Sequence, residues 1–427
     1  MNKTAGHPAR LLLDRRFWPL FWAQFTGAVN DNLLKNAYVI LIAYRETQSA
    51  GATEIIVTLA AAIFILPYFL LSATAGDLSD KYAKSWLLQR VKLTEIGVVA
   101  LGALSFALDS IAFQLFVLFL LGVQATFFGP IKYALLPELL KRGDLVDGNA
   151  LIEAGTFLGI LTGTIAGGLL ILLPGGAAWT SAALLVLSLG GFGASLMLPA
   201  TRPAAPRLQI QWNIAALTWE IIGQAHAKRK VWLAVLGISW FWLVGAALLS
   251  QFPNFAKEYL QAGNQVVTLF LTLNSIGVGL GSLLVSRMFK GRISADLVPW
   301  SALGMAICFA DLWWNSGGSG SPAHYMEAVE FLSYPAHWRV LADLFVLAVC
   351  AGIYIVPLYV IMQAESDIGS RSRVVAANNI LNALFIVIAG GGSALMLKLG
   401  SGVPAIFLAV GLLNTALAAA ILIKTRR

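Results

Sequence analysis

The sequence predicts an all-α membrane protein in which twelve helices cross the bilayer. Of the 427 residues, 58% are hydrophobic and 12% are charged, against roughly 25% charged residues in an ordinary soluble domain. The apolar residues gather in runs of the length that a helical span requires, about 20 residues. The predicted spans are residues 17–44, 54–75, 91–108, 112–136, 149–173, 178–198, 232–252, 265–286, 298–314, 339–362, 375–396 and 403–423.

Lysine and arginine are distributed unevenly between the segments that connect these spans. The segments on one side hold 22 of the 29 Lys and Arg residues, and those on the other side hold 4. Positively charged connections stay in the cytoplasm, so this asymmetry predicts that both termini are cytoplasmic. The net charge of +8 is therefore interpreted as a topology signal, and a nucleic-acid partner is not expected.

The longest predicted cytoplasmic connection, residues 199–231, separates six spans from six. It begins with the stiff, extended stretch PATRPAAP, and apolar residues then recur at helical spacing from Ile210 to Ile221. This pattern predicts a short amphipathic helix that either lies in the membrane interface or packs beneath the bundle. The predicted division is an N-terminal bundle of residues 1–198, a linker of residues 199–231 and a C-terminal bundle of residues 232–427.

The two halves of the chain echo each other. Pro130 and Glu138 around the fourth span recur, at one common offset, as Pro357 and Glu365 around the tenth. Parallel repeats of six helices with a substrate site between them are the plan of the major facilitator fold. The sequence therefore predicts two six-helix bundles related by pseudo-two-fold symmetry.

The connection between the second and third spans carries the motif GDLSDKYAK at residues 76–84. It resembles the Gly-x-Leu-x-Asp-Arg/Lys-x-Gly-Arg/Lys loop of major facilitators, with Ala83 in place of the second glycine. A carboxylate here can bind basic groups or a helix N-terminus across the cytoplasmic interface and so latch one conformation. The expected gating residues are Gly76, Asp80, Lys81 and Lys84. The corresponding segment at residues 281–287 lacks the acid, so a latch there is expected to be weaker or different.

Charged residues inside the predicted spans are the candidate site. An ionised side chain in hydrocarbon is costly unless it has a partner or faces a wet cavity, so such residues mark substrate paths. We expect Asp31 and Lys132 to pair in the absence of cargo, whereas Lys35 either binds cargo or extends to the interface. A purely structural charge network is the alternative. The candidate substrate-binding residues are Asp31, Lys132, Glu153, Asn30, Lys35 and Tyr133.

Other conspicuous residues are interpreted as structural. Gly155, Gly159, Gly163 and Gly167 form a small-residue stripe in the fifth span that permits close helix packing. Trp242, in the seventh span, is interpreted as an anchor at the membrane interface.

Three segments make the resemblance more specific: QFTGAVNDN at residues 24–32, FGPIKYALLPEL at 128–139 and GNALIEAGTF at 148–157. They are similar to the lysophospholipid transporters of bacterial inner membranes, and especially to the transporter segment that some bacteria fuse to an acyltransferase and an acyl-acyl-carrier-protein synthetase. The resemblance implies a flippase-like carrier that moves lysophosphatidylethanolamine to the cytoplasmic leaflet for reacylation, with Asp31, Lys132 and Glu153 at the head group. Some of these carriers have an arginine in the seventh span, but here the stretch GAALLSQ at residues 245–251 offers only Ser250 and Gln251 as polar residues.

Two other functions stay open at this point. One is an exporter of amphipathic drugs or other small solutes on the same fold, and the other is a non-transporting membrane platform for an acyltransferase. The sequence contains no catalytic, phosphate-binding or metal-ligand motif, so neither an enzyme nor a cofactor is expected. The expected partners are the lysophospholipid, the surrounding membrane lipids and an acyltransferase/acyl-ACP synthetase, around a monomer in the bacterial inner membrane.

Overall fold

The computed structural model describes residues 8–43, 50–316 and 324–425. The first half of the chain contains α1 (Trp18–Ala43), α2 (Ala50–Lys81), α3 (Lys84–Leu108), α4 (Ile111–Leu139), α5 (Leu145–Ile171) and α6 (Gly176–Leu196). The second half contains α8 (Arg229–Asn254), α9 (Asn264–Phe289), α10 (Val298–Trp314), α12 (Pro335–Glu365), α13 (Arg371–Lys398) and α14 (Val403–Thr425). A helix α7 (Ile214–Ala227) joins the halves, and a short helix α11 (Ala328–Ser333) precedes α12.

Ten of the described helices are long and apolar enough to cross a membrane. The polar residues in the middle of α1 lower its hydropathy, and α10 has only 17 residues, so these two fall short of that standard. Both nevertheless coincide with predicted spans, and the twelve long helices match the twelve predicted ranges to within a few residues at most ends. The predicted end of the first span, residue 44, lies outside the described residues.

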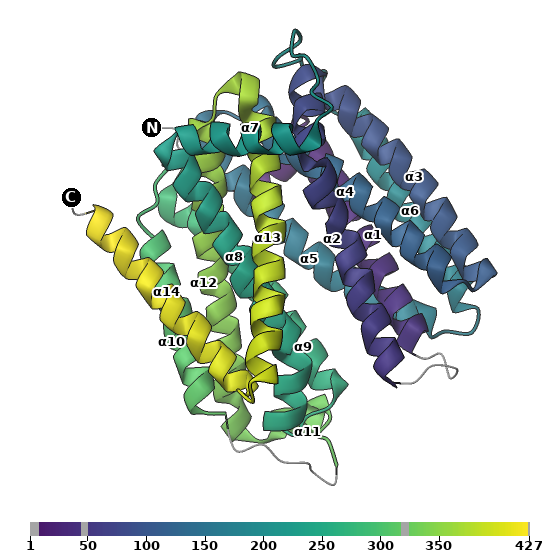
Figure 1. The fold of residues 1–427 in the computed structure, drawn as a ribbon, viewed down its shortest axis with the longest axis vertical. Coiled ribbons are helices and arrows are strands. Elements are labelled where there is room, and N and C mark those ends of the chain that lie inside the picture. Colours follow the sequence, from purple (N-terminus) through teal and green to yellow (C-terminus); the bar gives the residue numbers. More distant parts are fainter. Residues whose placement is uncertain (1–7, 44–49, 317–323, 426–427) are drawn as a thin grey trace.

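The helices form two groups that approach each other at the end of the molecule where α7 lies (Figure 1). Helices α1 to α6 lie on one side and α8 to α14 on the other, while α7 runs across the long helices. The chain enters α1 and leaves α14 toward this α7 end, as an even number of spans requires. The exact boundaries of the two predicted bundles stay a prediction, as does the assignment of the α7 end to the cytoplasm.

The glycine stripe permits close helix packing, as predicted, and the structure shows that the partner of α5 is α1. A Cβ atom added at Gly163 would lie 2.3 Å from the carbonyl oxygen of Val29, and one added at Gly167 would lie 2.4 Å from that of Leu33. These distances leave no room for a side chain. The close contact holds α1, with its intramembrane charges, in a fixed position beside α5.

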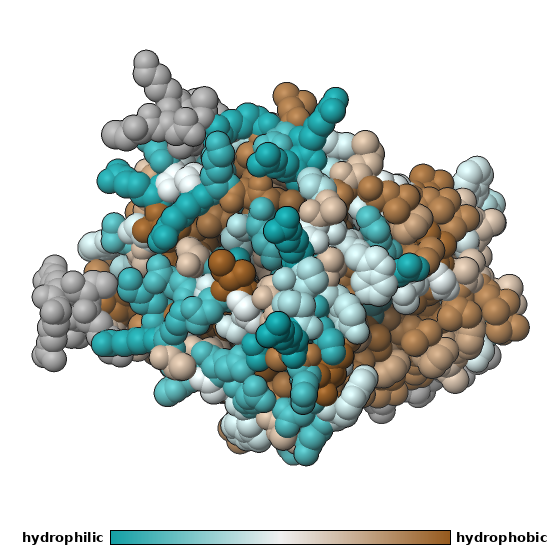
Figure 2. Space-filling model, turned by 90° about the horizontal axis from the view of Figure 1, so that it is seen from above, coloured by the Kyte–Doolittle hydropathy of each residue, from teal (hydrophilic) through white to brown (hydrophobic). Residues whose placement is uncertain are grey.

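Helix α7 packs against the ends of the long helices. This favours a helix packed on the bundle over a helix that lies in the membrane interface. Asn213 caps it by accepting a hydrogen bond from the backbone N–H of Ala216, and Leu217 and Ile221 are buried against the long helices. The face of the molecule at this end carries many hydrophilic side chains, next to a largely hydrophobic flank (Figure 2). This distribution is typical of a water-facing end beside a lipid-facing wall.

Candidate functional site

A cavity of about 290 Å³ lies between the two groups of helices. Asp31 and Lys35 of α1, Lys92 of α3, and Lys132 and Tyr133 of α4 line it from the first half. Residues of α8, α12 and α13 line it from the second half. Four of the six predicted substrate-binding residues, Asp31, Lys35, Lys132 and Tyr133, therefore meet at one cavity.

Asp31 and Lys132 do not form the contact ion pair that the sequence led us to expect. The Oδ1 atom of Asp31 is buried and has no hydrogen-bond partner among the described residues. The Lys132 ammonium lies 4.4 Å from the ring centroid of Tyr133, in a cation–π contact. Lys132 still interacts electrostatically with Glu153 and with Asp31. Both charged side chains thus keep capacity for a further partner.

Lys35 lies one helical turn from Asp31, farther from the α7 end. Its ammonium is 4.4 Å from the ring centroid of Phe64 on α2, so it stays inside the protein and does not extend toward the lipid. The cavity lining therefore combines the Asp31 carboxylate with the ammonium groups of Lys35, Lys92 and Lys132. That arrangement suits a ligand that carries both signs of charge.

Glu153 and Asn30 are placed differently from the other four residues. Glu153 is 1% exposed, does not belong to the cavity lining, and accepts a hydrogen bond of 2.7 Å from the Tyr133 hydroxyl. Asn30 is also outside the lining and donates a 3.1 Å hydrogen bond to Glu95. Both are buried behind the cavity wall.

Lys92, which lines the cavity, belongs to a buried charge pair that the sequence analysis did not assign. Lys92 and Glu95 of α3 form an ion pair of 2.6 Å, and both are fully buried. Glu95 also accepts a 2.9 Å hydrogen bond from Gln124. Opposite charges three residues apart lie on one helix face, which was the available sequence signal. With three donors, Glu95 is well satisfied, and the cluster stabilises the packing of α1, α3 and α4.

The second half contributes aromatic and amide groups to the cavity. Tyr359 of α12 and Trp242 of α8 line it, together with Asn379 and Asn382 of α13. The sequence analysis assigned Trp242 to the membrane interface, and the structure places it inside. The lining residues from this half are uncharged, so the charges of the site belong to the first half.

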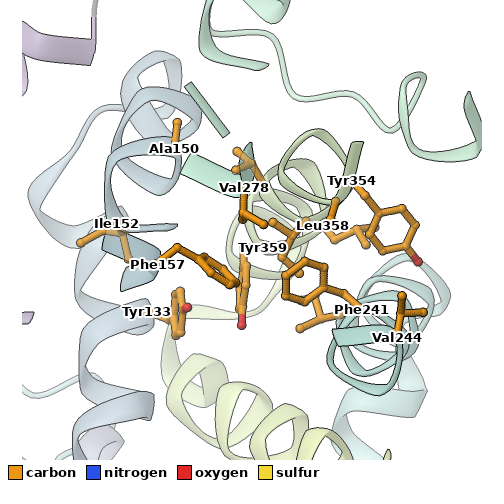
Figure 3. Close-up of a cluster of buried hydrophobic side chains, with 14 of the residues drawn as sticks. Tyr133, Ala150, Ile152, Phe157, Phe241, Val244, Val278, Tyr354, Leu358 and Tyr359 are labelled. Carbon is orange, nitrogen blue, oxygen red and sulfur yellow. The ribbon is translucent and has the colours of Figure 1, made fainter. Parts of the chain in front are cut away.

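An apolar pocket of about 180 Å³ adjoins this cavity. Phe157 of α5, Phe241 of α8 and Val278 of α9 line it (Figure 3), and it shares Trp242 and Ile386 with the charged cavity. Phe157 and Phe241 pack edge to face across the two halves, with ring centroids 6.0 Å apart. The two compartments together form a site with a charged part and an apolar part.

The predicted latch residue Asp80 meets the second half at the N-terminus of α13. Its carboxylate accepts hydrogen bonds of 3.1 and 3.2 Å from the backbone N–H groups of Ser372 and Arg373, and Arg373 Nε lies 3.5 Å from it. A carboxylate at a helix N-terminus is favoured by the helix dipole. Gly76 permits this approach, because a Cβ atom there would lie 2.7 Å from that of Ala376.

The other two predicted gating residues, Lys81 and Lys84, form no ion pair with a described residue of the second half. Lys84 forms an ion pair of 2.8 Å with Glu138 within the first half. Lys81 lies 5.9 Å from the ring centroid of Tyr82. Among the described residues of this motif, Gly76, Asp77 and Asp80 contact the second half, and Asp77 Oδ1 lies 4.0 Å from Arg373 Nε.

A related contact joins the end of α9 to the start of α5. Here the carboxylate belongs to the helix start, whereas Asp80 belongs to a helix end. Ser286 near the end of α9 donates a 2.6 Å hydrogen bond to Asp147, in the first turn of α5. We expected this contact to be weaker than that of Asp80 or different from it. It is different, because α9 supplies a hydroxyl and α5 supplies the carboxylate. Arg10, which also pairs with Asp144, lies 3.8 Å from Asp147.

Comparison with known proteins identifies the family. The sequence model of the Major Facilitator Superfamily matches residues 20–390. This chain belongs to that superfamily. Solved structures of major facilitators share its fold at low identity: the human organic anion transporter MFSD10 superposes with a TM-score of 0.72 at 15% identity, covering 95% of this chain and 99% of that one. The fucose:proton symporter FucP of Escherichia coli gives 0.69 at 14% identity, covering 94% and 96%.

Curated relatives within the superfamily carry the name lysophospholipid transporter LplT. The protein of Serratia proteamaculans (strain 568) is 26% identical over 405 residues, which cover 91% of this chain and 88% of the relative. The protein of Escherichia fergusonii is 27% identical over 400 residues, covering 91% and 90%. This major facilitator is thus similar to those transporters along nearly its whole length.

Proposed function

We propose that this chain transports lysophospholipids, chiefly lysophosphatidylethanolamine, across the bacterial inner membrane to the cytoplasmic leaflet by alternating access. The observation that carries the proposal is a cavity between two membrane-spanning bundles that has buried charges of both signs and adjoins an apolar pocket. A zwitterionic head group with one acyl chain has the matching chemistry. The names of the curated relatives support the same substrate class.

In this proposal the head group binds to the first half. Lys132 and Lys35 supply ammonium groups for the phosphate, and Asp31 supplies a carboxylate for the ammonium of ethanolamine. Asp31 is suited to this role because its Oδ1 has no hydrogen-bond partner among the described residues. A lipid head group would satisfy all three side chains at once.

The acyl chain then lies in the apolar pocket between Phe157 and Phe241. This pocket borders the charged cavity at Trp242, so one molecule can occupy both. Burying a methylene group stabilises a complex by about 0.8 kcal/mol, so even a partly buried chain contributes substantially to affinity.

We further propose that the α7 end faces the cytoplasm and that the structure is closed there. The Lys and Arg asymmetry supports this orientation. Among the described residues, the hydrogen bonds and ion pairs that join the two halves, including those of Asp80, Asp147 and Asn149, lie toward the α7 end. The cavity would then load from the outer leaflet and release its lipid after this end opens.

The chain is proposed to act as a monomeric carrier without chemistry of its own. Reacylation on the cytoplasmic side would be the task of a separate acyltransferase/acyl-ACP synthetase. Because major facilitators are its relatives in sequence and in fold, transport and not catalysis is the expected activity.

Inward movement of labelled lysophosphatidylethanolamine in proteoliposomes tests the proposal. We expect purified protein to move the lipid faster than empty vesicles do, and Asp31→Asn to abolish the difference. Asp367→Asn, which alters an exposed carboxylate outside the cavity, is the matched control. Rapid movement of an amphipathic drug without movement of lysolipid would favour an exporter. Movement of neither would favour a platform for an acyltransferase.

A further inference from the structure

Two stacked tyrosines lie closer to the α7 end than Asp31 does. The rings of Tyr133 on α4 and Tyr359 on α12 are nearly parallel, at 7°, with centroids 4.2 Å apart (Figure 3). Each lies six residues before the end of its helix, about 9 Å from that end, whereas Asp31 lies about 20 Å into α1. Both rings line the cavity and are almost completely buried. The pair forms the inner boundary of the site and joins the two halves.

A second contact between the halves lies one helical turn closer to the α7 end. Asn149 precedes Glu153 by four residues on α5, and Gln363 follows Tyr359 by four residues on α12. Their side-chain amides exchange two hydrogen bonds, of 2.9 and 2.8 Å, and both residues are fully buried. The stack and the amide pair therefore form two consecutive layers of one closed gate.

Glu153 connects this gate to the charges of the site. It lies behind Tyr133, outside the cavity lining, and accepts the hydrogen bond from the Tyr133 hydroxyl. Lys132, which is next to Tyr133 in sequence, lies over the ring of Tyr133 and interacts electrostatically with Glu153. A ligand that binds the Lys132 ammonium therefore acts on the two groups that hold Tyr133 in place.

We propose that Glu153, through its hydrogen bond to Tyr133, links head-group binding to the opening of the Tyr133–Tyr359 gate. The inference rests on the proposed lysophospholipid function. When the phosphate binds Lys132, Glu153 loses a cationic neighbour, and the head-group ammonium, which Asp31 holds first, then moves to the Glu153 carboxylate in its place. Tyr133 then loses its acceptor, its ring is no longer fixed against Tyr359, and the α7 end opens. Glu153 is thus a positioning residue for the gate as well as a receiver of the cargo's charge.

The distance between spin labels at K141C and R292C measures the opening of the α7 end. Both positions are exposed, and they lie in the first and second half respectively. The native Cys308 and Cys350 are replaced by alanine in this background. The probe is lysophosphatidylethanolamine, and lysophosphatidic acid, which has the phosphate but no ammonium group, is the comparison.

Without cargo, Tyr133→Phe is expected to lower the closed-to-open ratio on the order of tenfold, because a hydrogen bond to a charged acceptor is lost. Tyr38→Phe is the matched control, because it removes a buried 2.6 Å hydrogen bond to Ser105 that lies within one half. A distance distribution in Tyr133→Phe that equals the control overturns the gating role. This comparison uses no lipid, so its outcome does not depend on the proposed function.

With cargo, lysophosphatidylethanolamine should open wild type, and lysophosphatidic acid should bind without opening it. Glu153→Gln should bind lysophosphatidylethanolamine and stay closed, because the amide still accepts from Tyr133 but does not attract an ammonium group. Opening of this variant, or equal opening of wild type by both lipids, would overturn the coupling. Failure of wild type to bind either lipid would instead overturn the lysophospholipid function. Melting in detergent verifies that each variant is folded.

Discussion

At the scale of single residues, the site is defined by charges that the protein leaves incompletely satisfied. Lys92 and Glu95 are also buried charges, but they form a 2.6 Å ion pair with additional hydrogen bonds. Asp31 and Lys132 lack such a contact pair, and both line the cavity. A buried ion without a partner costs several kcal/mol, so a protein retains it where a ligand or water supplies the missing interaction.

Replacing Asp31 with asparagine is expected to reduce transport at least tenfold without unfolding the protein. The amide has the same shape as the carboxylate, and the substitution removes an incompletely paired buried charge. The melting temperature should therefore change by less than about 4 °C, which corresponds to a change of roughly 1 kcal/mol in the free energy of unfolding. Proteoliposome flux and thermal melting in detergent measure the two effects. Normal flux in a well-folded D31N protein would remove Asp31 from the site.

Replacing Lys132 with alanine is expected to abolish lysolipid binding with little loss of stability. If Lys132 were a structural counter-charge, its removal would cost about 3–5 kcal/mol, as expected for breaking a buried ion pair. Lys92→Ala is the contrasting variant, because it leaves Glu95 without its ion-pair partner and should lower the melting temperature strongly. Equal destabilisation of both variants, or unchanged binding by K132A, would contradict the proposed phosphate role.

The sequence predicted part of this site because charges in hydrophobic spans are rare and conspicuous. Asp31, Lys35 and Lys132 were found in this way. The sequence alone could not predict that Glu153 lies behind Tyr133, since the burial of a side chain depends on helix rotation and packing. Tyr359 was missed because an aromatic residue in an apolar span has no distinguishing local signal.

At the scale of helices, the position of the charges depends on the contact between α1 and α5. The absence of side chains along the glycine stripe lets the two backbones approach, so that Gly163 lies directly against Val29. Asp31 follows Val29 by two residues. Displacement of α1 would therefore move Asp31 relative to Lys132 on α4.

Gly163→Ala is expected to destabilise the protein by about 1–3 kcal/mol, which is typical of overpacking a close contact. The added Cβ would lie 2.3 Å from the carbonyl oxygen of Val29, and the backbone there cannot easily withdraw. Gly190→Ala in α6 is the control, because no atom lies within 4 Å of its Cβ position. Thermal melting of both variants gives the result, and equal stability would show that α1 and α5 can separate without cost.

The elements themselves were largely predictable, because a lipid environment requires long apolar helices. The two helices that fall short of the membrane-span standard are informative. Helix α1 is polar where it carries the site, and α10 is short, with 17 residues. The packing of α7 was left open by the sequence, because a periodic apolar face fits both a membrane surface and a protein surface. The buried Leu217 and Ile221 favour the protein surface.

At the scale of the whole molecule, the two halves are joined by separate contacts at the α7 end. Asp80 binds the start of α13, Ser286 binds Asp147 at the start of α5, and Asn149 pairs with Gln363. The first two contacts occupy related places in the two halves, but the acid comes from the end of α2 in one and from the start of α5 in the other. Such joints stabilise one conformation and must break when the other forms.

Asp80→Ala is expected to shift the molecule toward the form that is open at the α7 end, while lysolipid binding in the cavity is retained. The change removes two backbone hydrogen bonds to a carboxylate and its interaction with Arg373, and charge-assisted hydrogen bonds contribute about 1.5–3 kcal/mol each. A shift of the closed-to-open ratio by tenfold or more follows, and labelling of introduced cysteines on each face measures it.

Lys81→Ala is the control, because Lys81 belongs to the same motif but makes no contact with the second half among the described residues. An unaltered labelling pattern in Asp80→Ala would show that this contact is not a latch, whereas loss of lysolipid binding would show that the α7 end and the cavity do not act as separate parts.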